Sequence, residues 1–341
     1  MGIKKVLKAI FDYFGYEVRN KQSFPQKLDI PIDQIAQLYG PDVVQYMALT
    51  GAYSNECIER GVLPVAAHFY QPIPNLKDLE ERNIWELISP MNGIEWDISH
   101  FIEYLKELSE YASECSWPNE PTGNPMDFHI NNTCFSYGCA TALHSMIRKY
   151  KPKRIIEVGS GNSSKVIAAA ITANREESIG YSVNYSIIDP YSDIDVSIFP
   201  AGTELIKQAV ERMDVGFFDS LEKNDLLFID SSHTCKIGSD VNFEILDVLP
   251  TLKEGVFVHF HDIELPNEYS KTYAYLPTFR MFWTEAYLLQ AFLIGNKDWE
   301  ILLPLSWFQR NNAELFRELF PKGNDAVLWG SSSFWIRRKA D

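Results

Sequence analysis

The sequence has few cysteines and no long apolar run, and these absences exclude several classes of protein. Five cysteines among 341 residues are odd in number and include no Cys-x-x-Cys pair, so neither a disulfide framework nor a cysteine-rich zinc site is expected. No apolar run reaches the roughly 20 residues of a membrane helix. The first residues lack the apolar core and the cleavage site of a secretory signal. These absences predict a cytoplasmic chain with free thiols and no stable membrane insertion.

Positive charge is also in short supply. The chain has 31 Lys and Arg against 46 Asp and Glu, which gives a formal net charge of −15. An acidic surface repels a phosphate backbone, so we expect no nucleic-acid partner. Hydrophobic residues at 46% and charged residues at 23% are typical of an ordinary globular protein that buries a sizeable core.

Residues 1–130 read as a mainly helical region. Over residues 3–14, apolar side chains recur at helical spacing with lysines on another face. Such a stripe fits packing on its own domain or on a partner subunit, and a membrane surface is the alternative. Prolines interrupt the helical patterns of residues 30–117, and residues 117–125 are dense in turn formers, which is typical of a linker. We expect this region to act as a cap or in oligomerisation.

From about residue 131 to residue 341, short apolar segments alternate with helical patterns. This alternation predicts a Rossmann-like α/β fold, with a mostly parallel sheet and helices on both faces. In such sheets the ligand binds beyond the carboxyl ends of the strands. The expected strands are residues 154–158, 185–189, 225–230, 255–260, 299–303 and 332–337, and the expected helices are residues 139–150, 162–173, 239–249 and 277–294.

A glycine loop follows the first predicted strand, within the segment IIEVGSGNSS. Gly159 and Gly161 permit a sharp turn and a close approach to a ligand, and the next helix offers free N–H groups. Glu157 lies at the end of the strand, two residues before the first glycine. A ligand with an ammonium group would need a carboxylate at this position, whereas a dinucleotide would not need one. Asp189 ends the following strand and is placed to accept hydrogen bonds from ribose hydroxyls. A structural turn and an ordinary loop carboxylate are the alternatives.

Four ordered segments, residues 154–164, 188–190, 230–233 and 255–262, resemble the motifs of class I S-adenosylmethionine-dependent methyltransferases. The blocks EVGSGNSS, LLFIDSSH and GVFVHFHDIELPNEY resemble in particular an uncharacterised bacterial family near the macrolide-sugar O-methyltransferases. The resemblance implies that residues 131–341 form the methyltransferase domain. It also implies a seven-stranded sheet whose last strand runs antiparallel, with residues 332–337 as a candidate hairpin partner.

The same resemblance implies S-adenosylmethionine as the cofactor, with its α-amino group near Glu157. Asp214, after a weak third strand, is implied as a contact on the adenine side. The residues expected to contact the cofactor are Glu157, Gly159, Ser160, Gly161, Asn162, Ser163, Asp189 and Asp230.

Polar residues follow two neighbouring predicted strands. Asp230 and His233 stand three apart beyond one strand, and His261 and Asp262 end the next. Because the carboxyl ends of parallel strands share an edge, we expect these side chains to converge beside the transferable methyl group. Methyl transfer to a hydroxyl needs a base, and an imidazole titrates near neutral pH, so His233 is the expected base, with Asp230 beside it. A helix cap is the alternative role for His233.

In metal-dependent relatives that the chain resembles, the residues matching Asp230, His261 and Asp262 bind Mg²⁺. The histidine at position 261 departs from that pattern, because Mg²⁺ prefers oxygen donors. Mixed His and Asp ligands suit Mn²⁺, Fe²⁺ or Zn²⁺ better. The sequence therefore predicts a divalent cation at this edge, with metal-free base catalysis as the alternative.

These patterns predict an enzyme that methylates an oxygen of a small molecule or a glycan, and they leave open whether it acts alone or as an assembly of identical subunits. N-methylation, a nicotinamide-dependent oxidoreductase and a non-catalytic relative that binds the cofactor or a partner protein are the alternatives. An aromatic stripe fits either core packing or a roof over the acceptor. Its members are Phe279, Phe282, Trp283, Tyr287 and Phe292.

Overall fold

The structure is a computed structural model of the chain, and it describes residues 32–66, 69–276, 280–321 and 331–339. The chain divides into two compact units, Met1–Asp78 and Leu79–Asp341. The helix predicted over residues 3–14 lies outside the described residues. The boundary predicted at residue 130 falls within the second unit.

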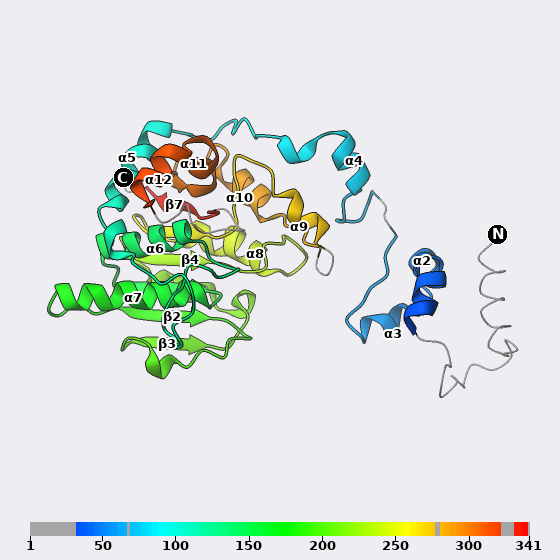
Figure 1. Cartoon of the computed structure of the whole chain (residues 1–341), viewed down its shortest axis with the longest axis horizontal. Helices are drawn as coiled ribbons and strands as arrows, with labels where there is room; N and C mark the ends of the chain where they lie inside the picture. Colours follow the sequence, from blue (N-terminus) through cyan, green and yellow to red (C-terminus); the bar gives the residue numbers. More distant parts are fainter. Residues whose placement is uncertain (1–31, 67–68, 277–279, 322–330, 340–341) are drawn as a thin grey trace, which may run out of the picture. The chain divides into compact units, whose positions relative to one another are not determined.

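The described part of the first unit is helical, in agreement with the sequence prediction (Figure 1). Its first helix continues through Pro41, although the sequence suggested a break there. Among the described residues, no helix is long and apolar enough to cross a membrane. The helices of this part are α2 (Ile32–Thr50) and α3 (Ser54–Ile58), and α4 (Leu76–Glu81) spans the division between the units.

The second unit is built on a sheet that, within the described residues, has seven strands in the order β3-β2-β1-β4-β5-β7-β6. The first five strands in sequence run parallel, and β7 runs antiparallel to both of its neighbours. The prediction of a seven-stranded sheet with an antiparallel last strand is confirmed. The strands are β1 (Arg154–Val158), β2 (Asn184–Ile188), β3 (Thr203–Ile206), β4 (Leu226–Ile229), β5 (Phe257–Phe260), β6 (Trp299–Pro304) and β7 (Phe334–Arg338).

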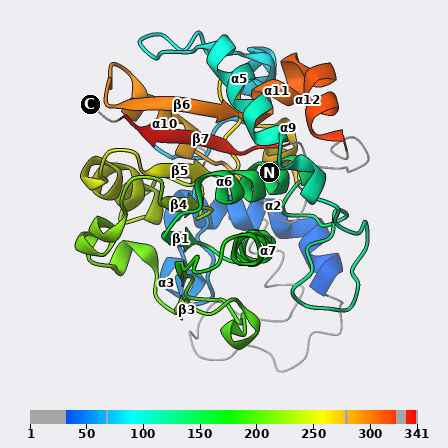
Figure 2. The same cartoon turned by 90° about the vertical axis from the view of Figure 1, so that its left-hand side faces the viewer.

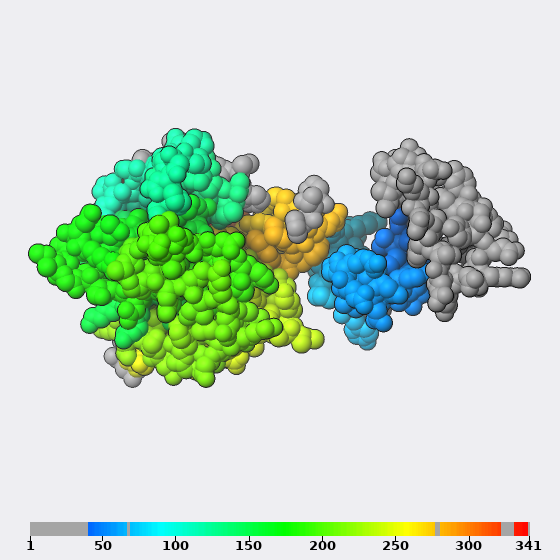
Figure 3. Space-filling view, turned by 90° about the horizontal axis from the view of Figure 1, so that it is seen from below, coloured from blue at the N-terminus to red at the C-terminus, as the bar shows by residue number. Residues whose placement is uncertain are grey.

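Helices cover both faces of this sheet, as predicted. All four residues of β4 and of β5 are buried, in keeping with their apolar sequences, and the one polar residue of β5, His259, lies 2.8 Å from the hydroxyl of Ser333. By contrast, β3 forms one edge of the sheet and stays partly exposed, on the surface seen in Figure 3. Figure 2 shows α6 and α7 beside the central strands, with α10 on the other side. The helices are α5 (Ile98–Ser109), α6 (Tyr137–Tyr150), α7 (Asn162–Glu177), α8 (Asp240–Asn242), α9 (Lys271–Tyr275), α10 (Glu285–Leu293), α11 (Leu305–Asn311) and α12 (Ala313–Leu319), with short 3-10 or π turns at Ile84–Glu86, Ala112–Glu114, Val196–Ile198, Val210–Arg212, Val215–Ser220, Phe243–Val248 and Leu249–Thr251.

Helix α5 belongs with the sheet. Asp97 caps it by accepting a hydrogen bond from the backbone N–H of His100, at 3.1 Å. Its apolar side chains recur at helical spacing, and this stripe is buried, with the helix packed near β6. The buried residues are Phe101, Tyr104, Leu105 and Leu108.

Two predicted elements differ from the structure. The aromatic helix expected over residues 277–294 begins only at Glu285, because the N–H groups of Thr284 and Glu285 donate to the carbonyl of His233 rather than to an earlier turn of their own helix. Strand β7 pairs antiparallel with β6, but the two do not form a direct hairpin, since α11 and α12 lie between them in the chain.

Candidate active site

The glycine loop lies where β1 ends and α7 begins. Gly159 has a φ of +95°, and a Cβ at this position would collide with the carbonyl oxygen of Asp230. A side chain is therefore excluded both by the backbone conformation and by the neighbouring strand. Gly161 has a φ of +144°, and its N–H donates to the hydroxyl of Ser164 at 3.0 Å. The loop thus brings the end of β1 against the end of β4.

Glu157 lies beneath this loop and is completely buried. Its carboxylate accepts hydrogen bonds from the hydroxyls of Ser163, at 2.6 Å, and Ser164, at 2.9 Å, and also from the hydroxyl of Tyr185. Burial raises the pKa of Glu157 to about 7, and the three hydroxyl groups only partly oppose that shift. Hydroxyl groups of the protein therefore bind the carboxylate of Glu157, which the sequence analysis expected to face an ammonium group of the ligand. The same hydrogen bonds connect the first turn of α7 and strand β2 to β1.

Asp189 follows β2 and is half-buried. One carboxylate oxygen accepts a hydrogen bond from the hydroxyl of Ser160 at 2.6 Å, and the other accepts one from the backbone N–H of Tyr191 at 2.8 Å. The structure thus brings together two residues that were predicted to contact the cofactor. A third, Asn162, donates from its side chain to Asn132 at 3.1 Å. Asn132 was missed from the sequence, which carries no motif for it.

Four polar side chains converge where β4 and β5 end, as the sequence predicted. The Nε2 of His233 lies 3.3 Å from Asp230 and 3.6 Å from Asp262. The Nδ1 of His261 lies 3.5 Å from Asp230 and 3.4 Å from Asp262. One ligand atom each from Asp230, His233 and Asp262 lie within 4.8 Å of one another, which is close enough for a shared metal ion.

The backbone at this cluster is unusual. His233 and Asp262 have φ values of +56° and +54°, in the left-handed region that residues with side chains rarely adopt. Such conformations cost roughly 1–3 kcal/mol each and concentrate at functional sites. Two of the four converging residues therefore hold strained conformations that direct their side chains toward the same point.

The electrostatics of the cluster are those of buried opposite charges. Burial alone would lower the pKa of His233, but its contacts with Asp230 and Glu285 outweigh burial and hold its pKa well above the usual range. In the same way, burial lowers the pKa of His261, and the charges of Asp262 and Asp230 raise it further than burial lowers it. Burial raises the pKa of Asp230 and of Asp262, but the imidazoles bring both below their usual range.

Sequence reasoning missed Glu285. Its carboxylate lies 2.8 Å from the Nδ1 of His233, on the opposite side of the ring from Asp230. The two residues are 52 positions apart in the chain, so spacing could not connect them. The signal that could have found it is a glutamate at the start of a mostly apolar helix, α10, where it is buried.

Other predicted residues have other surroundings. Asp214 is exposed and caps the 3-10 turn Val215–Ser220, accepting from the N–H of Gly216 at 2.7 Å. Within the aromatic stripe, Phe279 lies outside the described residues. The ring of Trp283 lies 4.7 Å from that of His233 between centroids, so one member of the stripe borders the cluster.

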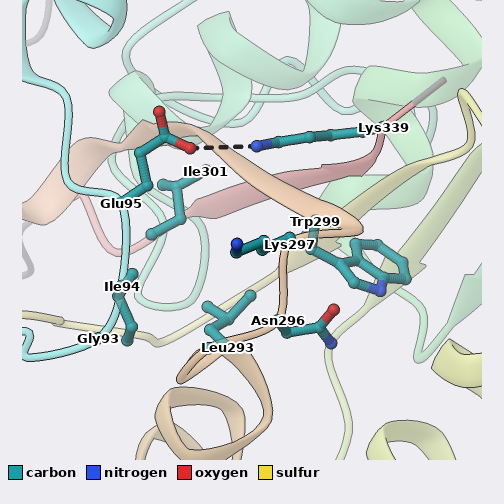
Figure 4. A pocket seen from close by; sticks show the side chains of 10 residues that line it. Gly93, Ile94, Glu95, Leu293, Asn296, Lys297, Trp299, Ile301 and Lys339 are labelled. Carbon is teal, nitrogen blue, oxygen red and sulfur yellow. Dashed lines mark hydrogen bonds and ion pairs between the residues drawn. The ribbon is translucent and has the colours of Figure 1, made fainter. Parts of the chain in front are cut away.

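A cavity of about 330 Å³ lies elsewhere, near the start of β6 (Figure 4). Its wall includes Trp299, Lys297 and Lys339, and Lys339 pairs with Glu95 at 3.1 Å. None of the predicted site residues lines it. The start of β6 is level with the start of β5, whereas the polar cluster follows the end of β5. We therefore assign the candidate site from its chemistry and not from this cavity.

The matches to known proteins include one family match, and its range covers both the glycine loop and the polar cluster. Residues 156–263 match a family described as a methyltransferase domain. An uncharacterised protein of Archaeoglobus fulgidus is 29% identical over 182 residues, which cover 50% of this chain and 80% of that protein. An apo structure of CmcI has 14% identity and a TM-score of 0.35, covering 80% of this chain and 98% of that chain. The matched segment begins in β1 and ends one residue beyond Asp262, so it spans both regions of the site. Residues 156–263 of the chain therefore carry a match to a methyltransferase domain.

Proposed function

We propose that this enzyme transfers a methyl group from S-adenosylmethionine to a hydroxyl oxygen of a small molecule or a glycan. The observation that carries the proposal is the convergence of Asp230, His233 and Asp262 at the edge where the glycine loop also ends. A neutral amine can attack a sulfonium without a base, whereas a hydroxyl must lose its proton as it attacks. A buried imidazole between carboxylates therefore favours oxygen over nitrogen as the acceptor.

The cofactor would lie across the glycine loop. Free N–H groups at the start of α7 and the carboxylate of Asp189 would bind its amino acid and ribose parts. Glu157 would act through Ser163 and Ser164, since it is itself buried. The remaining expected contacts are Gly159, Ser160, Gly161, Asn162 and Asp230.

His233 would accept the proton through its Nε2. Its pKa is raised in the free enzyme, because carboxylates face the ring from two sides. A cofactor sulfonium or a cation beside Asp230 would disfavour the protonated ring. Bound cofactor would thereby leave the Nε2 able to take the hydroxyl proton, and the acceptor oxygen could then attack the methyl carbon in line with the departing sulfur.

A divalent cation fits the donors of the cluster. Ligand atoms of Asp230 and Asp262 lie within 4.8 Å of each other and of His233. The Nδ1 of His261 lies 3.5 Å from Asp230 and 3.4 Å from Asp262, so it is a further candidate donor. Such mixed nitrogen and oxygen donors suit Mn²⁺, Fe²⁺ or Zn²⁺. When bound, the ion would hold the acceptor oxygen and lower the pKa of its hydroxyl. Because a metal ligand cannot serve as the base, we assign His233 to the proton and the other three residues to the cation.

The test is a screen of the full chain with S-adenosylmethionine against hydroxyl compounds and their matched amines. We expect mass spectrometry to detect S-adenosylhomocysteine and methylated product with hydroxyl acceptors only. Nucleic acids are left out of the screen because the acidic net charge of the chain disfavours them as substrates. A chelator followed by Mn²⁺ or Mg²⁺ should remove and then restore activity. Methylated amines without methylated hydroxyls would contradict the choice of oxygen, and full activity after exhaustive chelation would contradict the cation.

A further inference from the structure

The His233 ring is held from the side that faces away from Asp230. We infer that Glu285 is a positioning residue for His233, fixing the orientation of the ring so that its Nδ1 is held and its Nε2 faces the site. The carboxylate of Glu285 lies 2.8 Å from the Nδ1. An ionised carboxylate can only accept hydrogen bonds, so beside ionised Glu285 the Nδ1 keeps its proton and the Nε2 is the nitrogen that can lose one. The Nε2 is then the nitrogen directed at Asp230 and Asp262, at 3.3 and 3.6 Å.

Backbone hydrogen bonds also hold His233 against the start of α10. The carbonyl of His233 accepts hydrogen bonds from the N–H groups of Thr284, at 2.9 Å, and of Glu285, at 3.1 Å. The hydroxyl of Thr284 in turn accepts a hydrogen bond from the N–H of Cys235 at 2.7 Å. The start of α10 and the segment after β4 are therefore joined through both backbone and side chain. This joint explains how His233 is held at its left-handed φ of +56°.

Burial of Glu285 argues for a role beyond the helix itself. A carboxylate near a helix N-terminus is stabilising at the surface, where water still solvates it. Glu285 is 1% exposed, and one of its oxygens has no hydrogen-bond partner among the described residues. Burying such a group is costly unless it is paired. Its partner is His233, which is 6% exposed, and the ring of Trp283 packs against the same imidazole.

The inference rests on the proposed function for the part that His233 plays in catalysis. The orientation of the His233 ring can be measured without any assumption about catalysis. The experiment uses the full chain labelled with 15N-histidine, without cofactor or acceptor, and identifies the His233 signals by their loss in His233→Gln. We expect a protonated Nδ1 with a proton shifted downfield by its carboxylate partner. In Glu285→Gln that proton signal should be lost or moved upfield, and turnover should fall about 10–100-fold, by analogy with the loss when the carboxylate partner of a metal-bound histidine is removed.

Asp225→Asn is the matched control, because Asp225 is also a buried carboxylate but accepts hydrogen bonds from the backbone N–H groups of Lys153 and Arg154 and not from His233. It should leave the Nδ1 proton signal of His233 unchanged. If Glu285→Gln does not fold, the wild-type spectrum alone still decides, since an unprotonated Nδ1 in the wild type would overturn the inference. A folded Glu285→Gln with an unchanged Nδ1 signal would also overturn it. If instead a His233 variant keeps full turnover, the catalytic part assigned to His233 in the proposed function fails while the measured orientation stands.

Discussion

The glycine loop and the polar cluster both contain buried or half-buried carboxylates, but they stabilise them with different partners. At the loop, Glu157 is surrounded by hydroxyl groups, and Asp189 accepts from a hydroxyl and a backbone N–H. At the cluster, Asp230 and Asp262 face two imidazoles. Hydroxyl groups do not change charge near neutral pH, whereas an imidazole does.

This difference separates a scaffold from a reactive centre. Hydrogen bonds from hydroxyls fix the glycine loop in one shape, so a ligand meets a preformed surface. The imidazoles can gain or lose a proton, so the cluster can respond to a bound charge. The two regions touch at Gly159, where a side chain would meet the Asp230 carbonyl. Substitutions in each region should therefore have distinct effects, and the one at their contact should affect both.

The largest effect is expected at the cluster. His233→Ala should lower turnover about 10²–10⁴-fold, the usual contribution of a general base, while the affinity for S-adenosylmethionine stays near that of the wild type. Steady-state kinetics and calorimetry measure the two quantities. His129→Ala is the matched control, because His129 lies in the segment before α6 and takes no part in the cluster. Unchanged turnover in His233→Ala would assign proton removal to another group.

The contact between the two regions is tested by a pair of glycine substitutions. Gly159→Ala must accommodate both a positive φ and a collision with Asp230, whereas Gly161→Ala has a positive φ but no atom within 4 Å of the new Cβ. Backbone strain costs roughly 1–3 kcal/mol at either position, and overpacking adds roughly 1–3 kcal/mol at Gly159 alone. Chemical denaturation should show the larger loss for Gly159→Ala, together with lower turnover. Equal losses would mean that β1 and β4 separate easily here.

The hydroxyl-lined carboxylate predicts a pH dependence of stability. Burial raises the pKa of Glu157 to about 7 from an ordinary value of 4.5. Between those pH values the unfolded chain has lost this proton and the folded chain has kept it, so this group's contribution to stability falls as pH rises through the window and levels off above it. The loss is about 3 kcal/mol at about 1.4 kcal/mol per pH unit.

Glu157→Gln removes that titration while keeping the shape of the side chain. The stability of the wild type relative to Glu157→Gln should therefore decrease between pH 5 and pH 8, as followed by denaturant unfolding. A relative stability that rises with pH would mean that the hydroxyl groups favour the ionised form more than burial disfavours it.

The fold was largely predictable, because most of its strands and helices are specified by sequence patterns within each segment. The strands of the sheet are short apolar runs between glycines and prolines, and their order with the glycine loop indicated a seven-stranded methyltransferase sheet. The start of α10 was not predictable, since a carbonyl on a distant segment, that of His233, sets it.

The site was predictable only where a motif marks it. Asp230, His233, His261 and Asp262 follow strands and were found. Glu285 was not, because it reaches the site through tertiary packing. The partners of Glu157 were also unforeseen: Ser163 and Ser164 stand in the motif, but Tyr185 joins them from the neighbouring strand, and only the parallel register of β1 and β2 places it there.

The smallest effect is expected at Asp189, in the glycine-loop region. Its carboxylate is half-buried and already accepts hydrogen bonds from Ser160 and from the backbone of Tyr191. Each carboxylate oxygen has a further lone pair, so it can still accept from ribose hydroxyls. Asp189→Ala should weaken the binding of S-adenosylmethionine by about 1–3 kcal/mol in calorimetry, as expected for the loss of hydrogen bonds to a charged group. Asp193→Ala is the matched control: Asp193 is fully exposed on the same loop, so its substitution removes an equal charge without a buried contact and should change the affinity little. Equal effects of the two substitutions would mean that Asp189 acts only through its charge. Asp189 would then not belong to the preformed surface that binds the cofactor.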